Sequence, residues 1–270
     1  MKRLLLLLPI CLCFAPRNES EALGLPSANG IVALTPDMAG RPSPEQFERL
    51  VQTDIVRALA AGLARYRAEV QDYTCVMTKQ ERLGGKVRPV EIIRCAYREK
   101  PYSVLMKWEA GDSKAISSLF VQGENNDELI VLPKLLGFIK KTVSRSPSHP
   151  DVKDASRYSV FEFGIAKGQE RTYAAWKAAQ QAGLLNVEFL GERPIPELEN
   201  RPCYVIHRMV NPPEEDGMTD LTIYIDKETW LQTGSILTAN GNLIGSYFFN
   251  DVKTNQKLGK DDFKPEVLKK

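Results

Sequence analysis

The sequence predicts a mainly β protein with a few helices. The expected fold is a strongly curved, incompletely closed antiparallel β-barrel of about eleven strands, with a long N-terminal helix and a second helix covering its open side. Three observations predict it. Strand-like segments recur at hairpin-like spacing, turn dipeptides such as Gly84-Gly85 and Asn240-Gly241 separate them, and two segments with helical periodicity accompany them.

The composition is that of an ordinary globular protein. The chain has 270 residues, of which 43% are hydrophobic, with 36 Lys+Arg against 34 Asp+Glu. These proportions exclude collagen, coiled coils and disordered tails. A formal net charge of +2 gives no electrostatic reason to expect a nucleic-acid partner. We expect a single domain over residues 43–270.

The first 22 residues have the pattern of a secretory signal peptide. Two basic residues lie in Met1–Arg3, the apolar run Leu4–Ala15 follows, and the small residues Ser20 and Ala22 complete the pattern. A membrane anchor is the alternative, but a transmembrane helix needs about 20 apolar residues. We therefore predict that residues 1–22 are a signal peptide and that the protein is exported.

A flexible leader and a helix follow. Residues 23–42 contain Gly, Pro, Ser and Asn without periodicity, as leaders do. Ser43 then provides an N-cap, Pro44 the first helical position and Gln46 the third position of a capping box. Apolar residues recur at three- and four-residue steps as far as Val70. This spacing predicts one long amphipathic helix from Pro44 to Val70.

The strand-like segments form two sets around a Ser-, Pro- and Asp-rich stretch at 144–157. A second helix is expected near Gln169–Ala182, ending at Gly183. An antiparallel meander is the economical topology, and a barrel of more than about eight strands tends to enclose a ligand. The predicted strands are Tyr73–Leu83, Lys86–Arg98, Tyr102–Glu109, Ser117–Gln122, Glu128–Leu132, Gly137–Val143, Leu185–Arg193, Pro202–Val210, Thr219–Asp226, Leu231–Leu237 and Asn242–Val252.

Three cysteines remain after the signal peptide, and two of them flank the first hairpin. Pairing about Gly84-Gly85 sets Cys75 opposite Cys95, or one residue from opposite. Because the compartment is expected to be oxidising, we predict a Cys75–Cys95 cross-strand disulfide, with Cys203 as a single thiol. Three buried, unpaired cysteines are the alternative.

No sequence motif predicts catalysis. The chain has two histidines, His149 and His207, and lacks the GxSxG, HExxH and phosphate-loop patterns. The acidic run Glu214-Glu215-Asp216 lacks the alternating spacing of a calcium loop, so we interpret it as a solvated hairpin loop. We expect no catalytic residue, no metal site and no cofactor.

Apolar residues that alternate along the strands are the candidate ligand-binding residues. Alternation places them on one face of each strand, and Met and Trp suit adaptable contact with an acyl chain. Ordinary core packing is the alternative for each of them. The candidates for lining a hydrophobic cavity are Val104, Met106, Trp108, Leu119, Val121, Ile223 and Ile225.

A second candidate surface combines basic and apolar side chains. Lys140, Lys141 and Arg145 lie beside the apolar residues of 135–139, a combination that suits contact with the headgroups of a membrane surface. A charged edge strand that discourages strand pairing is the alternative.

Two stretches resemble known exported bacterial proteins. Residues 221–258, LTIYIDKETWLQTGSILTANGNLIGSYFFNDVKTNQKL, resemble the LolA/LolB-like superfamily of outer-membrane lipoprotein-sorting (lipoprotein carrier) folds. Residues 73–108, YTCVMTKQERLGGKVRPVEIIRCAYREKPYSVLMKW, resemble an uncharacterised exported family grouped with those carriers. The resemblance implies a LolA-like half-barrel with a helical lid and a hydrophobic cavity that accepts acyl chains.

These observations lead to one functional interpretation and two alternatives. We interpret the chain as a non-enzymatic protein of the bacterial periplasm or cell envelope that binds lipid acyl chains or an acylated lipoprotein in a hydrophobic cavity. The first alternative is a protein-interaction or envelope-assembly module whose barrel is filled by its own side chains. The second is an enzyme that acts on envelope lipid or polysaccharide.

Overall fold

The computed structural model describes residues 40–134, 141–214 and 216–269. The predicted signal peptide, most of the predicted leader and Lys140 lie outside the described residues. Residues 40–270 group into one compact unit. Within the described ranges, no helix has the length and apolar character needed to cross a membrane.

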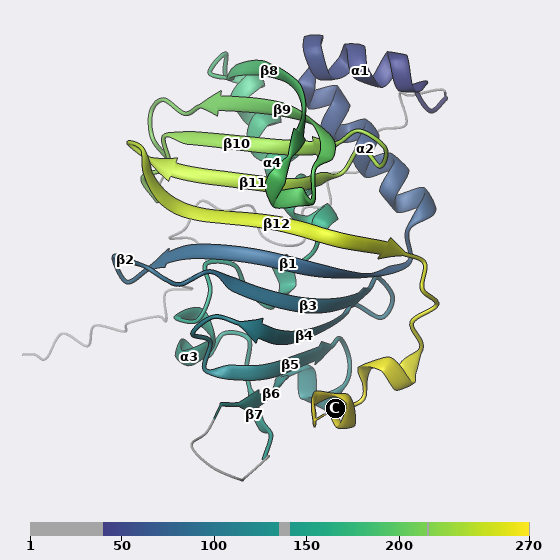
Figure 1. Ribbon diagram of the computed structural model, residues 1–270, viewed down its shortest axis with the longest axis vertical. Helices are drawn as coiled ribbons and strands as arrows, with labels where there is room; N and C mark the ends of the chain where they lie inside the picture. Colours follow the sequence, from purple (N-terminus) through teal and green to yellow (C-terminus); the bar gives the residue numbers. More distant parts are fainter. Residues whose placement is uncertain (1–39, 135–140, 215, 270) are drawn as a thin grey trace, which may run out of the picture. The chain divides into compact units, whose positions relative to one another are not determined.

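Twelve strands form one antiparallel sheet (Figure 1). Their order is β7-β6-β5-β4-β3-β1-β12-β11-β10-β9-β8, with β2 paired to β1 alone, so the described strands leave the sheet unclosed. The predicted fold class is therefore confirmed. The strands are β1 Asp72–Leu83, β2 Lys86–Val87, β3 Glu91–Arg98, β4 Ser103–Ala110, β5 Ala115–Val121, β6 Leu129–Pro133, β7 Val143–Arg145, β8 Asn186–Ile195, β9 Arg201–Met209, β10 Asp220–Asp226, β11 Gln232–Ala239 and β12 Asn242–Thr254.

The topology differs from a single meander. Strands β1 to β7 form one meander and β8 to β12 form another, and the two are joined where β1 pairs with β12. Residue pairs between these two strands, such as Met77 with Phe249, thus connect the N-terminal and C-terminal parts of the described chain. The expected strand Lys86–Arg98 divides into β2 and β3, and the strand predicted over Gly137–Val143 is found at Val143–Arg145, with residues 137–140 outside the described ranges.

The helices lie on one face of this sheet, which we call the inner face. They are α1 Pro44–Thr53, α2 Ile55–Glu69, α3 Pro150–Lys153 and α4 Ile165–Gln181. Short 3₁₀ turns connect or follow the strands: η2 Asn125–Asp127, η3 Val160–Glu162, η4 Pro196–Leu198, η5 Lys260–Phe263 and η6 Pro265–Lys269. Of these elements, α1, α2 and α4 bury apolar side chains against the inner face.

The predicted single helix from Pro44 to Val70 is wrong, because the chain breaks at Asp54. Its backbone is not helical, with φ −151° and ψ 76°, and its carboxylate accepts a hydrogen bond of 3.1 Å from the Arg57 backbone N–H. Asp competes for backbone donors and so favours helix ends over helix interiors. The capping box at Ser43 is confirmed, since the Gln46 N–H donates to Ser43 Oγ and the Ser43 N–H donates to Gln46 Oε1.

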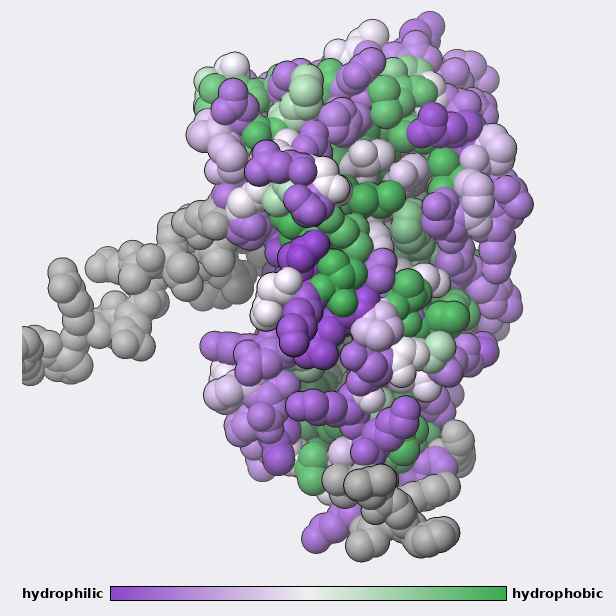
Figure 2. Space-filling model, turned by 60° about the vertical axis from the view of Figure 1, so that its left-hand side comes forward, coloured by the Kyte–Doolittle hydropathy of each residue, from purple (hydrophilic) through white to green (hydrophobic). Residues whose placement is uncertain are grey.

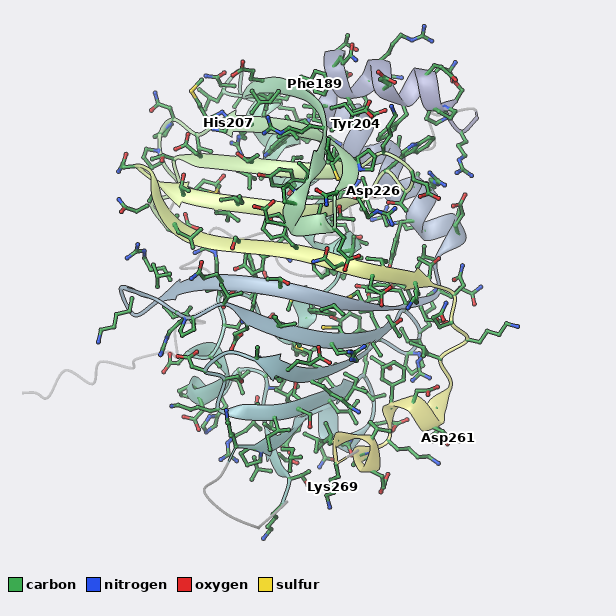
Figure 3. The ribbon with its side chains drawn as sticks, in the orientation of Figure 1. Phe189, Tyr204, His207, Asp226, Asp261 and Lys269 are labelled. Carbon is green, nitrogen blue, oxygen red and sulfur yellow. The ribbon has the colours of Figure 1, made fainter. Side chains whose placement is uncertain are left out.

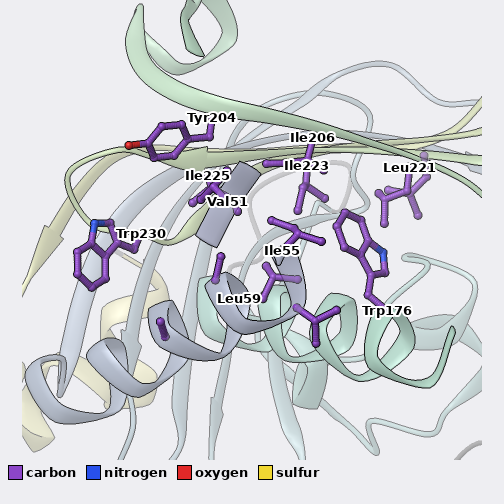
Figure 4. Packing of buried hydrophobic residues seen from close by; sticks show 14 of the residues in the cluster. Val51, Ile55, Leu59, Trp176, Tyr204, Ile206, Leu221, Ile223, Ile225 and Trp230 are labelled. Carbon is purple, nitrogen blue, oxygen red and sulfur yellow. The ribbon is translucent and has the colours of Figure 1, made fainter. Parts of the chain in front are cut away.

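The largest core lies between the helices and strands β9 to β12 (Figure 4). Ile223 and Ile225 project from β10 towards α1 and α2, and Trp176 of α4 packs in the same cluster. Phe47 of α1 stacks on Trp230 with ring centroids 4.3 Å apart. These contacts fill the inner face of this half of the sheet with the protein's own side chains.

The outer face carries smaller clusters. The η5 and η6 turns place Phe263 and Leu268 against β5, and the Ser117 hydroxyl donates a hydrogen bond of 2.8 Å to the Leu268 carbonyl. Near the other end of the sheet, Leu198 of η4 packs on Cys203, Val205 and Phe248. Both faces of the sheet are thus partly covered, the inner one by helices and the outer one by short turns.

Candidate functional site

The seven predicted cavity residues do not line one surface. Ile223 and Ile225 are fully buried beneath α1 and α2. Leu119 and Val121 lie on the outer face with Phe263 and Leu268, because Leu119 pairs with Leu105 in the register of β4 and β5. Their expected placement on the inner face is wrong. Alternation on β5 actually turns Ser118 and Phe120 inward.

The other three, Val104, Met106 and Trp108, lie together on the inner face of β4. Val104 is buried, whereas Met106 and Trp108 are half-buried. Met106 pairs with Ser118, Ser118 with Val131, and Val131 with Val143. We call these four residues, Met106, Ser118, Val131 and Val143, the inner row. Directly paired residues share a face, so the inner row is continuous across β4 to β7.

The inner row is less covered than the buried core beneath α1 and α2. Met106, Val131 and Val143 are each half-buried. Phe161 of η3 is 50% exposed and packs edge-on against Phe120, with ring centroids 5.0 Å apart. The row thus presents three partly exposed apolar side chains, on β4, β6 and β7, while Ser118 on β5 is buried. Partly exposed apolar side chains of this kind suit an apolar ligand.

Trp108 adds a polar group beside the inner row. Its indole Nε1 atom is buried and has no hydrogen-bond partner among the described residues. Buried indole N–H groups usually have an acceptor, because leaving one unpaired is costly. The hydrogen-bonding capacity of this N–H is therefore unused among the described residues.

An ionic cluster lies on the inner face next to this surface. Lys79 of β1 pairs in register with Glu91 of β3, and its Nζ atom lies 3.2 Å from Glu91 Oε2 and 2.9 Å from Glu81 Oε2. The side chains of Lys79 and Glu81 are 7% and 3% exposed. The Tyr247 hydroxyl donates to Glu81 Oε1 over 2.7 Å. Burial, and then the charge of Glu81, raise the pKa of Tyr247.

The ionic cluster holds a connecting segment against the inner face. The Arg157 backbone N–H donates to Glu81 over 3.3 Å, and Ser156 Oγ lies 3.3 Å from Lys79 Nζ. The Tyr158 ring contacts the Tyr247 ring. The sequence analysis did not identify this cluster. Lys79 and Glu81 lie on the same strand face as the apolar Cys75 and Met77, because every second residue of a strand points to one face. Charged residues that continue an apolar face could have indicated buried charge.

Cys75 lies directly opposite Cys95, so the predicted hairpin register is confirmed. Both are buried and are thiols in this structure. The hydrogen bond with the Cys95 thiol, and then burial, raise the pKa of Cys75. The disulfide stays a prediction. Mass spectrometry of a non-reduced digest of protein from the host envelope should find the linked peptides, and alkylation of both Cys75 and Cys95 after unfolding without reductant would contradict it.

Cys203 is buried beneath η4 and should be unreactive in the folded protein. Burial, and secondarily the nearby Asp226, raise the pKa of its thiol to about 12. Because the thiolate is the reactive form, we expect a neutral-pH thiol reagent to leave Cys203 unlabelled until the protein is unfolded. Rapid labelling of Cys203 in the native protein would contradict this.

The two histidines have structural partners. His149 caps α3 through its Nδ1 atom, which accepts a hydrogen bond of 3.2 Å from the Asp151 N–H. His207 Nε2 lies 3.2 Å from Asp220 Oδ1. His207 and Asp226 lie near opposite ends of the paired strands β9 and β10 (Figure 3).

The structure describes only part of the candidate membrane-contact surface predicted around Lys140, Lys141 and Arg145. Lys141 is exposed, and Arg145 Nε lies 3.8 Å from Asp151 Oδ2, while Lys140 lies outside the described residues. In Figure 2 the side of the molecule that is on the left in Figure 1 comes forward, and apolar side chains gather there in patches separated by polar ones. Contact of this region with a membrane remains a proposal.

Comparison with known proteins gives one family match. A family model described as a protein of unknown function, DUF1571, matches residues 70–268. This confirms the prediction of an uncharacterised family. No curated protein sequence matches the chain.

Several solved structures are similar to the chain at low sequence identity. A domain assigned to outer-membrane lipoprotein sorting, from Vibrio parahaemolyticus, has 12% identity and a TM-score of 0.37, covering 80% of this chain and 98% of its own. The lipoprotein LppX of Mycobacterium tuberculosis has 11% identity and a TM-score of 0.43, covering 77% and 99%. MucB has 13% identity and a TM-score of 0.44, covering 78% and 63%. We assign the fold from the strand order of the antiparallel sheet and not from these similarities.

Proposed function

The chain belongs to the DUF1571 family, whose description gives no function, and we propose from the site geometry that it is a non-enzymatic protein that binds an acylated amphiphile on the inner row. The ligand class is a lipid or an acylated lipoprotein. The proposed compartment is the periplasm or cell envelope, because residues 1–22 have the signal-peptide pattern.

The observation that carries this proposal is a difference in side-chain burial between the two halves of the inner face. Under α1, α2 and α4, residues such as Ile223 are fully buried. Along the inner row, Met106, Val131 and Val143 retain exposure on β4, β6 and β7, whereas Ser118 on β5 is buried. A bound acyl chain would cover that row and gain about 0.8 kcal/mol for each buried CH₂ before binding costs.

The neighbouring groups suit an amphiphile better than a plain hydrocarbon. The unpaired Nε1 of Trp108 can donate to an ester carbonyl at the side of the row. Met106 can adapt to chains of different shape because its side chain is unbranched and flexible. Lys140, Lys141 and Arg145 are proposed to contact anionic headgroups when the protein approaches a membrane.

A charge placed on the inner row should weaken binding of a fatty-acid probe. We expect Val131→Asp to weaken binding of a fluorescent fatty acid by about ten-fold or more, because the carboxylate would lose hydration against the chain. Val87→Asp is the matched control, since Val87 is 42% exposed on β2, away from the row. Fluorescence titration measures both, and equal affinity for the two variants would refute the assignment.

The identity of the natural ligand can be sought directly. We expect native mass spectrometry of the protein from its host envelope to show a co-purifying acylated molecule, which solvent extraction would release. An empty protein that also fails to bind the probe would contradict the proposed function.

A second candidate function is favoured by the filled half of the sheet. The close packing of α1, α2 and α4 on β9 to β12 supports a protein-interaction or envelope-assembly module. Under that reading, the empty protein described above would be the expected result, together with a stable complex with another envelope protein. An envelope-directed enzyme has no comparable observation in its favour.

A further inference from the structure

A more deeply buried pair of residues lies beside the inner row. Val104 of β4 pairs in register with Phe120 of β5, and each lies two positions along its strand from an inner-row residue, Met106 or Ser118. Residues two apart on a strand share a face and lie about 7 Å from each other. Val104 and Phe120 are 1% and 0% exposed, whereas Met106 is half-buried. On β4, the cover over the inner face therefore ends between Val104 and Met106.

The η3 turn provides part of this cover and carries Phe161 at its edge. Val160 packs in the same cluster as Val104. The Phe161 ring packs edge-on against the Phe120 ring, with centroids 5.0 Å apart, and yet Phe161 remains 50% exposed. An apolar ring that contacts a fully buried neighbour and is itself half exposed lies where the cover stops. Phe161 is therefore next to the inner row.

The backbone that carries Phe161 is held in place by a side chain of the sheet. The Tyr102 hydroxyl donates a hydrogen bond of 2.6 Å to the Val160 carbonyl and lies 3.1 Å from the Phe163 carbonyl. The Tyr102 ring also packs edge-on against the Phe120 ring, with centroids 6.1 Å apart. These contacts fix the backbone on both sides of Phe161, so the position of its ring relative to β5 is defined.

Trp108 bounds the other side of the inner row. On β4 it lies two residues beyond Met106, on the same face, and it pairs with Ile93 of β3. Trp108 is half-buried and Ile93 is fully buried. Phe161, packed on Phe120, and Trp108 thus flank the row on opposite sides along the strand direction. The partly exposed apolar surface between them is one row of side chains wide.

We propose that Phe161 forms a side wall of the acyl-binding site and that, with Trp108 on the other side, it restricts the site to a single unbranched chain. This inference rests on the proposed function, because it names the ligand class of the same site. The chain would lie across β4 to β7 along the inner row, with the Phe161 ring against one flank. A methyl branch would have to displace that ring, and packed apolar groups tolerate added carbon atoms poorly.

The test compares a straight and a branched fatty acid with the same main chain. Palmitic acid and phytanic acid, which differ only in the methyl branches of the second, each compete with the fluorescent fatty acid for the mature full chain. We expect the parent protein to bind palmitic acid more tightly by about ten-fold or more, because a fitted apolar site discriminates against added carbon atoms by factors of this order.

Four variants connect this preference to the side wall. Phe161→Ala should reduce the preference for palmitic acid to about three-fold or less, because the branches can enter the freed space, and Phe161→Trp should increase it. Tyr102→Phe keeps the ring but frees the η3 carbonyls, so it should reduce the preference by a smaller factor. Leu184→Ala is the matched control and should keep the parent's preference, since Leu184 is 54% exposed between α4 and β8. A general loss of stability would weaken binding of both acids and leave their ratio unchanged.

The outcomes separate this inference from the proposed function. Equal affinity of the parent protein for the two acids would overturn the side wall, as would an unchanged preference in the folded Phe161→Ala variant. If that variant does not fold, an unchanged or lowered preference in Phe161→Trp would overturn it instead. In each of these cases, retained binding of palmitic acid would leave the inner-row function in place. A parent protein that binds neither acid nor the fluorescent probe would overturn the proposed function, and the side wall with it.

Discussion

Replacing Lys79 with methionine is expected to destabilise the protein by about 3–5 kcal/mol, because it leaves two buried carboxylates without their cation. Lys79 Nζ lies 2.9 Å from Glu81 and 3.2 Å from Glu91. Methionine fills much of the same volume, so the loss would come from charge rather than from a cavity. Urea denaturation followed by circular dichroism measures the change in the free energy of unfolding.

Two further variants test whether the charge of Lys79 is responsible. Lys253→Met removes a lysine whose ion pair with Asp251 is exposed, and it should change stability by less than about 1 kcal/mol. Adding Glu81→Gln to Lys79→Met should recover part of the loss, because one uncompensated charge disappears. Equal effects of Lys79→Met and Lys253→Met would contradict the importance of the ionic cluster.

Gly62→Ala should also destabilise the protein, by about 1–3 kcal/mol, although alanine is normally favoured over glycine inside a helix by about 1 kcal/mol. Gly62 lies in α2, and a Cβ atom built on it would lie 2.3 Å from the Trp230 carbonyl oxygen and 2.5 Å from Gln169 Nε2. The first of these atoms is backbone and cannot rotate away. The substitution would therefore push α2 from its neighbours.

The contact at Gly62 matters because Gln169 joins three elements there. The Gln169 side chain is fully buried, its Nε2 atom donates to the Leu59 carbonyl over 2.9 Å, and its Oε1 atom accepts from the Gln232 N–H over 3.0 Å. It thus links α4 to α2 and β11. Displacing its amide would leave buried polar groups unpaired.

Gly168→Ala in α4 is the matched control for the glycine substitution. A Cβ atom there would meet only the end of the Arg171 side chain, at 4.0 Å, so helix propensity alone should act and the variant should be stabilised by about 1 kcal/mol or less. Opposite signs for the two substitutions are the expected result of thermal and urea unfolding. A stabilised Gly62→Ala variant would show that α2 does not pack as closely as described.

The sequence by itself determined the local features of this fold. The capping box at Ser43, most strand positions and the hairpin that sets Cys75 opposite Cys95 each depend on residues close together in the chain. Helix caps, turns and the alternation of strand residues each depend on a few neighbouring residues, so the residue types at those positions are enough to predict them. The fold class followed from adding these elements together.

Only the tertiary structure decided which distant elements meet. The pairing of β1 with β12, the outward placement of Leu119 and the approach of α4 to Gly62 join segments far apart in the chain. Leu119 shows the reason, because its face depends on register across the sheet, and a shift of one residue reverses it.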